Sequence, residues 1–332
     1  MPANPSRSML TFHVGLPKTA TTAAQRVLSR STETLSAAGI DYVDILRNRE
    51  GIAHHSLPAE LLERRDADGP HARALVDRVK RTSARHTIVS SEALTNVIAS
   101  PRRMVFVDLL AEIAQVMPVR VVIVLRRVDD FFTSMYLQSA KVGEVTSPIE
   151  AYLSTRTMWS RGLFTGLRTI RRSPFEPSIC VVKYEPGPAF LGRILGQIIG
   201  DARLLTSEEL SGRESGRLTT KAHAVLLNLD LVEERIGYSL KRFPLIRAME
   251  LGKLVFEDDT KSFSLLPRDE AEAIHRAALD AAQEAGENHY ARYFRTSVIK
   301  EKTLVSLAPD VLSDADIEAV AQYAKRTNQP TR

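Results

Sequence analysis

The chain has one cysteine among its 332 residues, so neither an intramolecular disulfide nor a cysteine metal cluster can form. This residue, Cys180, lies in the apolar run 179–182, where we expect a packed strand residue and not a nucleophile. No stretch of about 18–20 apolar residues is present, and the polar N-terminus, 1–8, does not resemble a signal peptide. The sequence therefore predicts a cytoplasmic protein without an integral membrane segment.

Dense runs of basic residues are also missing. Lys and Arg number 45 and Asp and Glu number 40, which gives a formal net charge of +5. Arginine pairs such as Arg102-Arg103 and Arg171-Arg172 stand alone. This surplus permits an anionic ligand, but it is too dispersed for a nucleic-acid arm. We therefore expect no nucleic-acid partner.

Short apolar runs alternate with helical patterns in the first half of the chain. Runs without polar alternation are typical of strands covered on both faces, and they predict strands at 9–14, 86–90, 119–125 and 178–183. Helical patterns between them predict helices at 19–28, 102–116 and 129–141. Strand–helix alternation of this kind predicts an α/β fold with a central, mainly parallel sheet.

From about residue 219 onward the pattern is helical. Apolar spacing predicts helices at 219–236, 268–284 and 314–326, with Ser313 and Asp316 as a capping box for the last. The stretch 206–216 is the predicted flexible connection. We interpret residues 9–300 as one domain and 301–332 as a C-terminal helical extension; a separate C-terminal helical domain is the alternative.

The segment 13–22 (HVGLPKTATT) joins the first predicted strand to the first predicted helix. Free N–H groups and the positive end of the helix dipole attract phosphate at such a place. Lys18 adds a full positive charge, and threonine hydroxyls follow that can cap the helix or bind the anion. The segment is not a Walker loop, because Ala20 occupies the second glycine position and no Gly-Lys-Ser/Thr follows.

The same segment resembles the 5′-phosphosulfate loop of the PAPS-dependent sulfotransferase family, whose usual form is Pro-Lys-Ser/Thr-Gly-Thr-Thr. The resemblance implies a P-loop NTPase-like three-layer fold and 3′-phosphoadenosine 5′-phosphosulfate (PAPS) as co-substrate, without a metal. It also implies that Lys18 reaches the oxygen between phosphorus and sulfur. Ala20 replaces the usual glycine, and we expect its methyl group to be tolerated if φ there is negative. Ala23 stands where some members carry an adenine-stacking aromatic, so no adenine contact is assigned.

A second motif follows the predicted strand 119–125. An arginine at a strand end and a serine two helical turns later can converge on a phosphate at the sheet edge. This spacing, Arg126 with Ser134, resembles the family's 3′-phosphate motif. Members often have Arg-Asn-Pro where this chain has Arg-Arg-Val, so Arg127 stays open as the phosphate ligand. The implied donor-binding residues are Pro17, Lys18, Thr19, Ala20, Thr21, Thr22, Arg126 and Ser134.

Two further segments resemble bacterial, carbohydrate-type members of the family. The run 88–92 (IVSSE) resembles their strand-end Ser-Ser-Glu, and 286–294 (GENHYARYF) resembles the end of their C-terminal helix. The resemblance implies transfer of a sulfuryl group from PAPS to a hydroxyl or amine, with carbohydrate as the first acceptor and lipid or small phenolic metabolites as alternatives.

Such a transfer needs stabilisation of the leaving group and removal of the acceptor proton. Lys18 is placed for the first role. Family members use a glutamate or histidine near the sulfur, which makes Glu92 the candidate base and His55 its rival. The structural alternatives for Glu92 are capping of the next helix and an ion pair with a nearby arginine. All three, Lys18, Glu92 and His55, are the candidate catalytic residues.

Two other functions stay open. One is a kinase-like P-loop enzyme that binds ATP with magnesium, although no magnesium aspartate follows a predicted strand. The other is a catalytically degenerate member that only binds a nucleotide or a partner protein. We expect His13 to pack inside the first strand and Trp159 to be an ordinary half-buried aromatic. The sequence shows no clear metal constellation.

Overall fold

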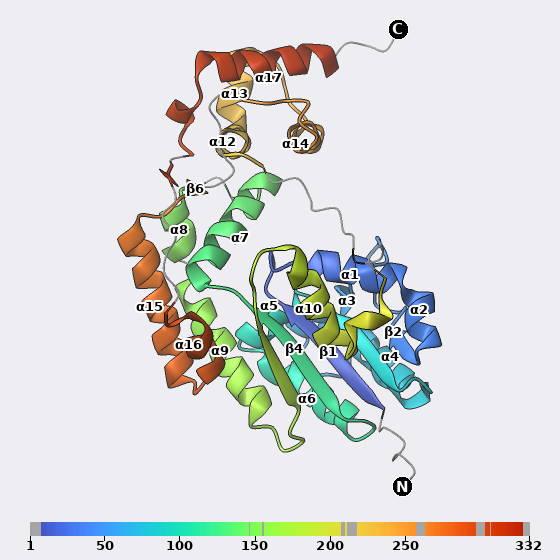
Figure 1. Cartoon of the computed structure of the whole chain (residues 1–332). Helices are drawn as coiled ribbons and strands as arrows, with labels where there is room; N and C mark the ends of the chain where they lie inside the picture. Colours follow the sequence, from blue (N-terminus) through green and yellow to red (C-terminus); the bar gives the residue numbers. More distant parts are fainter. Residues whose placement is uncertain are drawn as a thin grey trace. The chain divides into compact units, whose positions relative to one another are not determined.

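The computed structural model describes residues 8–145, 147–154, 156–206, 210, 218–256, 263–296, 303–305 and 307–327 (Figure 1). The chain forms two compact units. The first consists of Met1–Phe131, Thr157–Arg213 and His275–Ser297, and the second of Phe132–Arg156, Glu214–Ile274 and Val298–Arg332. The predicted boundary between residues 300 and 301 falls outside the described ranges, so the predicted domain limits stay a prediction.

A five-stranded, all-parallel sheet lies at the centre of the first unit, in the order β2-β3-β1-β4-β5. All four predicted strands are present: β1 Met9–Gly15, β3 His86–Ser90, β4 Val119–Leu125 and β5 Ser178–Lys183. The edge strand β2, Ile40–Tyr42, is too short to show a pattern in the sequence. Cys180 is partly buried in β5, where its thiol donates to Gln197 Oε1 at 3.2 Å, which confirms a packed strand residue.

Helices cover both faces of this sheet. On one face, α1 (Thr21–Arg30), α2 (Thr32–Ala37) and α10 (Pro188–Ile199) share a core with β2, β3, β4 and β5. On the other face, the ring of Phe12 in β1 meets Phe106 of α6 (Arg103–Ala114) edge to face, 5.4 Å between centroids. There α6 contacts α4 (Pro70–Arg81), α5 (Leu94–Ala99) and α9 (Thr157–Arg171). The first unit is therefore an α/β structure with helices on both sides of a parallel sheet.

The strand order brings three strand ends together. The chain leaves β1 toward β2 through α1, and it leaves β3 toward β4 through α5 and α6 on the opposite face. The register aligns His13 of β1 with Ser90 of β3 and Val122 of β4. Open α/β sheets bind ligands outside the carboxyl ends of strands where the connections diverge in this way. The segments that follow β1, β3 and β4 are thus the place to look for a site.

The remaining helices include α3 (Ser56–Glu63), α7 (Val128–Val142), α15 (Arg268–Glu284) and α16 (Asn288–Phe294). The second unit holds α8 (Ile149–Ser154), α12 (Thr220–Leu227), α13 (Leu229–Ile236), α14 (Arg242–Glu250) and α17 (Asp314–Thr327), with a small parallel pair, β6 (Phe263–Ser264) and β7 (Thr303–Leu304).

Most predicted helices are confirmed with small shifts at their ends. The exception is 219–236, which forms two helices because the backbone leaves helical geometry at Asn228 (φ −109°, ψ 33°). The capping box is confirmed: Ser313 N–H donates to Asp316 Oδ2 at 2.9 Å, and Asp316 N–H donates to Ser313 Oγ at 3.2 Å. Nearly all of the predicted connection 206–216 lies outside the described residues. No helix in the described ranges has the length and apolar character needed to cross a membrane.

Candidate active site

The loop between β1 and α1 has an unusual backbone. Lys18 (φ 65°) and Ala20 (φ 63°) both adopt left-handed conformations. A Cβ on Gly15 would lie 2.0 Å from Thr21 Cγ2, so any larger residue would displace the Thr21 side chain where α1 begins above the strand end. The Thr19 hydroxyl is buried and donates to the Leu16 carbonyl at 2.6 Å, which closes the loop. Two left-handed non-glycine residues in one short loop are the kind of strain that accumulates at ligand sites.

Two expectations for this loop are wrong. Ala20 does not have a negative φ; it is the N-cap of α1 with φ 63° and ψ 17°, a region that glycine occupies more easily. The N-cap position is not a threonine either, since Ala20 occupies it and makes no side-chain capping hydrogen bond. The first hydrogen bond inside α1 runs from Ala24 N–H to Ala20 C=O at 3.0 Å. The amides of the preceding turn, at residues 21–23, therefore have no partner within the helix and suit an anion.

The left-handed conformation of Ala20 leads to a prediction for two substitutions. Ala20→Gly should change the free energy of unfolding by less than about 1 kcal/mol, because relief of the Cβ strain offsets the extra freedom of glycine in the unfolded chain. Ala20→Val should lower it by more than about 2 kcal/mol, because a branched Cβ adds to the strain. Urea unfolding of both variants measures the difference. Equal stability of the valine variant and the wild type would rule out a left-handed residue here.

Arg126 connects this loop to the end of β4. Its Nη1 donates to the carbonyl of Lys18 at 3.3 Å, and its guanidinium lies 5.4 Å from the ring centroid of Tyr184. The Arg126 side chain is half-buried. In the loop itself, Lys18 and Thr22 are exposed, Pro17 and Ala20 are half-buried, and Thr19 and Thr21 are buried. The fold thus places the Arg126 guanidinium against the backbone of Lys18, the lysine of the predicted phosphate loop.

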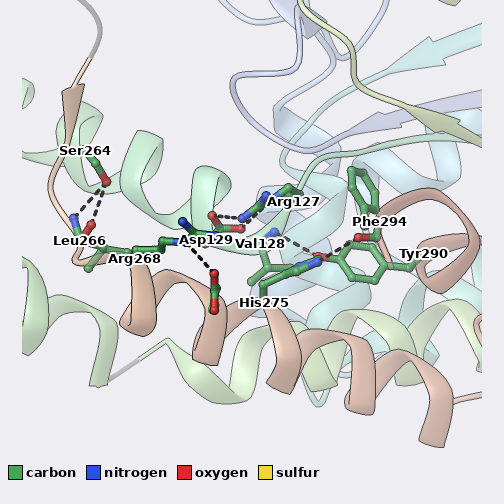
Figure 2. Close-up of polar contacts among 10 residues, drawn as sticks. Arg127, Val128, Asp129, Ser264, Leu266, Arg268, His275, Tyr290 and Phe294 are labelled. Carbon is green, nitrogen blue, oxygen red and sulfur yellow. Dashed lines mark hydrogen bonds and ion pairs between the residues drawn. The ribbon is translucent and has the colours of Figure 1, made fainter. Parts of the chain in front are cut away.

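Arg127, the alternative phosphate ligand, is buried in a bidentate ion pair with Asp129 (Figure 2). The distances are 3.0 Å from Nε to Oδ1 and 2.7 Å from Nη2 to Oδ2. Because the Arg127 guanidinium is already paired with a carboxylate, Arg126 is the better candidate to bind an incoming phosphate. Ser134 lies on α7 in the second compact unit, so its convergence with Arg126 stays a prediction.

A buried hydrogen-bond relay, which runs from Val128 through Tyr290 to His275, holds the start of α7 next to both arginines. The N–H of Val128 donates to the Tyr290 hydroxyl at 3.1 Å (Figure 2). His275 Nε2 donates to the Phe294 carbonyl at 3.0 Å, which leaves Nδ1 to accept from Tyr290 at 3.5 Å. Burial raises the pKa of Tyr290, so this phenol keeps its proton. Sequence reasoning missed the relay; the resemblance of 286–294 gave Tyr290 no role.

The two candidate bases lie side by side. Glu92 Oε1 is 3.6 Å from His55 Nε2, while Gln25 Nε2 of α1 donates to Glu92 Oε2 at 2.7 Å. On its other nitrogen, His55 Nδ1 lies 2.8 Å from the Ser91 hydroxyl. Side-chain exposures of 36% for His55 and 21% for Glu92 leave both within reach of a substrate. Sequence reasoning named both residues but missed the contact between them and the role of Gln25.

Neither structural alternative for Glu92 is found among the described residues. The N-cap of α5 is Ala93, with no side-chain capping hydrogen bond. The side-chain partners of Glu92 are a glutamine and a histidine, not an arginine. A half-buried carboxylate that is held by a neutral donor beside an imidazole has the geometry of a general base.

Two further histidines lie beneath this pair and stay neutral. His13 is confirmed as a packed strand residue, with Nδ1 2.8 Å from the Ser90 hydroxyl. His54 Nε2 donates to the Val43 carbonyl at 2.8 Å, and its Nδ1 accepts from Ser90 N–H at 3.0 Å. Burial lowers the pKa of His13 to about 3 and that of His54 to about 4. His54 therefore anchors the segment that presents His55.

Comparisons with protein-family models, with curated proteins and with solved structures find no match. Trp159 is half-buried, as expected, and stacks on Phe131 with 4.9 Å between centroids. Within the described part of the chain, no group of three or more His, Cys, Asp or Glu side chains could hold a metal ion. A function must therefore be argued from the geometry of the three strand ends.

Proposed function

We propose that this chain is a PAPS-dependent sulfotransferase with a P-loop NTPase-like three-layer fold. The observation that carries the proposal is the order of functional groups along one sheet edge. Strands β3, β1 and β4 are neighbours. Their carboxyl ends lead, in that order, to Glu92, to the Lys18 loop and to Arg126, and His55, from the segment after β2, lies beside Glu92. Along the sheet edge, a candidate base is followed by a phosphate loop and then by a second phosphate ligand. This order suits an acceptor beside the base, a sulfuryl group at the loop and a bisphosphate nucleotide that extends to Arg126.

The donor carries two phosphate groups, and the loop region offers two anion sites. The amides at residues 21–23, which precede the first hydrogen bond inside α1, and the exposed Lys18 suit the 5′-phosphosulfate. Arg126 suits the 3′-phosphate, because its planar guanidinium can bind two phosphate oxygens at once. The left-handed backbone at Lys18 and Ala20 supports the assignment, since such strain persists where a loop is shaped for a ligand.

The reaction is an in-line displacement at sulfur. The acceptor oxygen or nitrogen forms a bond to sulfur as the bond from sulfur to the bridging oxygen breaks. The electron pair of the broken bond stays on the phosphate of 3′,5′-adenosine bisphosphate, where Lys18 stabilises the developing charge. The acceptor proton passes to the pair of His55 and Glu92. Positioning and charge stabilisation supply the catalysis in a transfer of this type.

Titration with 3′,5′-adenosine bisphosphate tests the donor assignment. We expect binding without metal, and at about 100 times the dissociation constant the ligand should add roughly 2.7 kcal/mol to the free energy of unfolding. Arg126→Ala should weaken this nucleotide about 10–150-fold and its 3′-dephosphorylated analogue far less, because a charge-assisted contact is lost. Isothermal titration calorimetry measures both affinities.

The matched control is Arg26→Ala, which removes an exposed arginine from α1 and should leave both affinities unchanged. Equal weakening of both nucleotides by Arg126→Ala would remove the 3′-phosphate role of this arginine. Absence of binding would overturn the donor assignment. Tight binding of ATP only with magnesium would favour a kinase-like enzyme instead.

A further inference from the structure

Helices α5 and α9 pack backbone to backbone. A Cβ on Gly162 would lie 2.1 Å from the Ala99 carbonyl oxygen, and one on Gly166 would lie 2.1 Å from the Ile98 carbonyl oxygen. Any side chain at either glycine would push the helices apart, because the obstructing atoms belong to the backbone. The two glycines therefore fix the position of α9 against α5.

This close packing places Trp159 beside α5. Trp159 lies one turn before Gly162 on α9, and its indole Nε1 donates to Asn96 Oδ1 at 3.4 Å. The ring stacks on Phe131 with an interplanar angle of 29°. Asn96 is exposed and Trp159 is half-buried, so part of the indole and the amide of Asn96 reach solvent.

The candidate base Glu92 lies in the same segment of the chain, four residues before Asn96. The Thr95 hydroxyl donates to the Glu92 carbonyl at 2.6 Å, and Thr95 N–H donates to the same oxygen at 3.1 Å, so the helical turn begins at Glu92. Glu92 and Asn96 are both accessible while Leu94 and Thr95 between them are buried. The candidate base Glu92 thus lies in the turn that leads into α5, and Asn96, with Trp159 bonded to it, lies in the first turn of that helix.

We infer that Trp159 and Asn96 form the acceptor subsite, and that the acceptor is a hydroxylated ring of the sugar class. The inference rests on the proposed function, since it places the acceptor by the proposed base. A pyranose presents a face of C–H groups, which packs against the negatively polarised face of an indole. Its ring-edge hydroxyls match the amide of Asn96, whose –NH2 donates and whose oxygen accepts. A flat apolar acceptor cannot form hydrogen bonds with the Asn96 amide, and an acyclic polyol has no ring face that could pack on the indole.

Intrinsic fluorescence tests this subsite directly, because Trp159 is the one tryptophan in the chain. We expect cellobiose to cause a saturable change in the emission of Trp159. D-glucitol, which carries similar hydroxyls without a ring, should cause none at equal concentration. Absence of a saturable change with cellobiose, or an equal change with D-glucitol, would overturn the subsite.

Two variants sharpen the test. Asn96→Ala should weaken cellobiose about 3–10-fold through the loss of a hydrogen bond. Met158→Ala, at an exposed neighbour of Trp159, should leave the affinity unchanged. Equal affinities of both variants and the wild type would show that Asn96 takes no part. The bisphosphate nucleotide should bind the Asn96 variant normally. Cellobiose binding to a protein that fails to bind this nucleotide would overturn the donor assignment while leaving the sugar site in place.

Discussion

Replacement of Glu92 by glutamine should lower turnover about 10²–10⁴-fold with an alkyl hydroxyl as acceptor, the usual effect of losing a general base. Glutamine keeps the size of the side chain and can still accept from Gln25, but it cannot take a proton. The loss should shrink toward unity for an acidic phenol, because that acceptor is already partly ionised. Turnover of labelled PAPS across acceptors of different pKa measures this dependence.

The contact between His55 and Glu92 adds a second expectation. Either residue can take the acceptor proton directly while the other orients or stabilises it, since the distance between Nε2 and Oε1 is 3.6 Å. In both His55→Gln and Glu92→Gln, the loss of turnover should therefore depend on the pKa of the acceptor. The double variant should lose little more turnover than the worse single variant. Lys18→Ala should depress turnover equally for all acceptors, because every reaction expels the same bisphosphate.

Glu33→Gln is the matched control, since it removes an exposed carboxylate from α2 on the same unit. Turnover and nucleotide affinity of this variant should equal those of the wild type. A modest, acceptor-independent loss in Glu92→Gln would leave the carboxylate a structural role. If His55→Gln alone then showed the steep dependence, the imidazole would be the base.

Acidification from pH 7 to pH 5 should lower the free energy of unfolding by several kcal/mol. Burial lowers the pKa of His13 to about 3 and those of His54 and His86 to about 4, against 6.5 for an exposed histidine. Below pH 6.5 these histidines bind protons in the unfolded chain but stay neutral in the folded chain. Stability is therefore fully present above pH 6.5 and is lost as the pH falls toward 4.

Each such histidine contributes a slope of about 1.4 kcal/mol per pH unit, and three contribute about 4 kcal/mol per unit. The loss between pH 6.5 and pH 5 is then about 6 kcal/mol, which is a large part of the roughly 5–15 kcal/mol by which whole domains are stable. Carboxyls whose pKa is lowered in the fold, such as Glu60 and Asp316, act only below about pH 4.5, outside this window.

Urea unfolding at pH values from 5 to 8 measures the slope. His86→Gln should reduce it by about one third, since glutamine keeps a polar group near the Thr11 hydroxyl but takes up no proton. Unchanged stability between pH 5 and pH 7 would mean that the buried histidines titrate as readily in the folded chain as in the unfolded one.

The parallel sheet was open to prediction because its physical signature is local. Strands of a parallel sheet lack regular polar alternation, and the apolar stretches within β1, β3, β4 and β5 show that pattern. The position of Lys18 between a strand and a helix follows from the same local patterns. The three-residue β2 carries too few side chains to show one.

Other features depend on contacts between residues far apart in the chain, and only the tertiary structure decided them. The positive φ of Ala20 arises where the loop is closed by Thr19 and by Arg126, 108 residues from Lys18. Arg126 and Arg127 look alike in the sequence, and the Asp129 ion pair separates them. Gln25 meets Glu92 across 67 residues. Local patterns define which segments form strands and helices, whereas a site depends on which distant side chains the packed sheet brings within hydrogen-bonding distance.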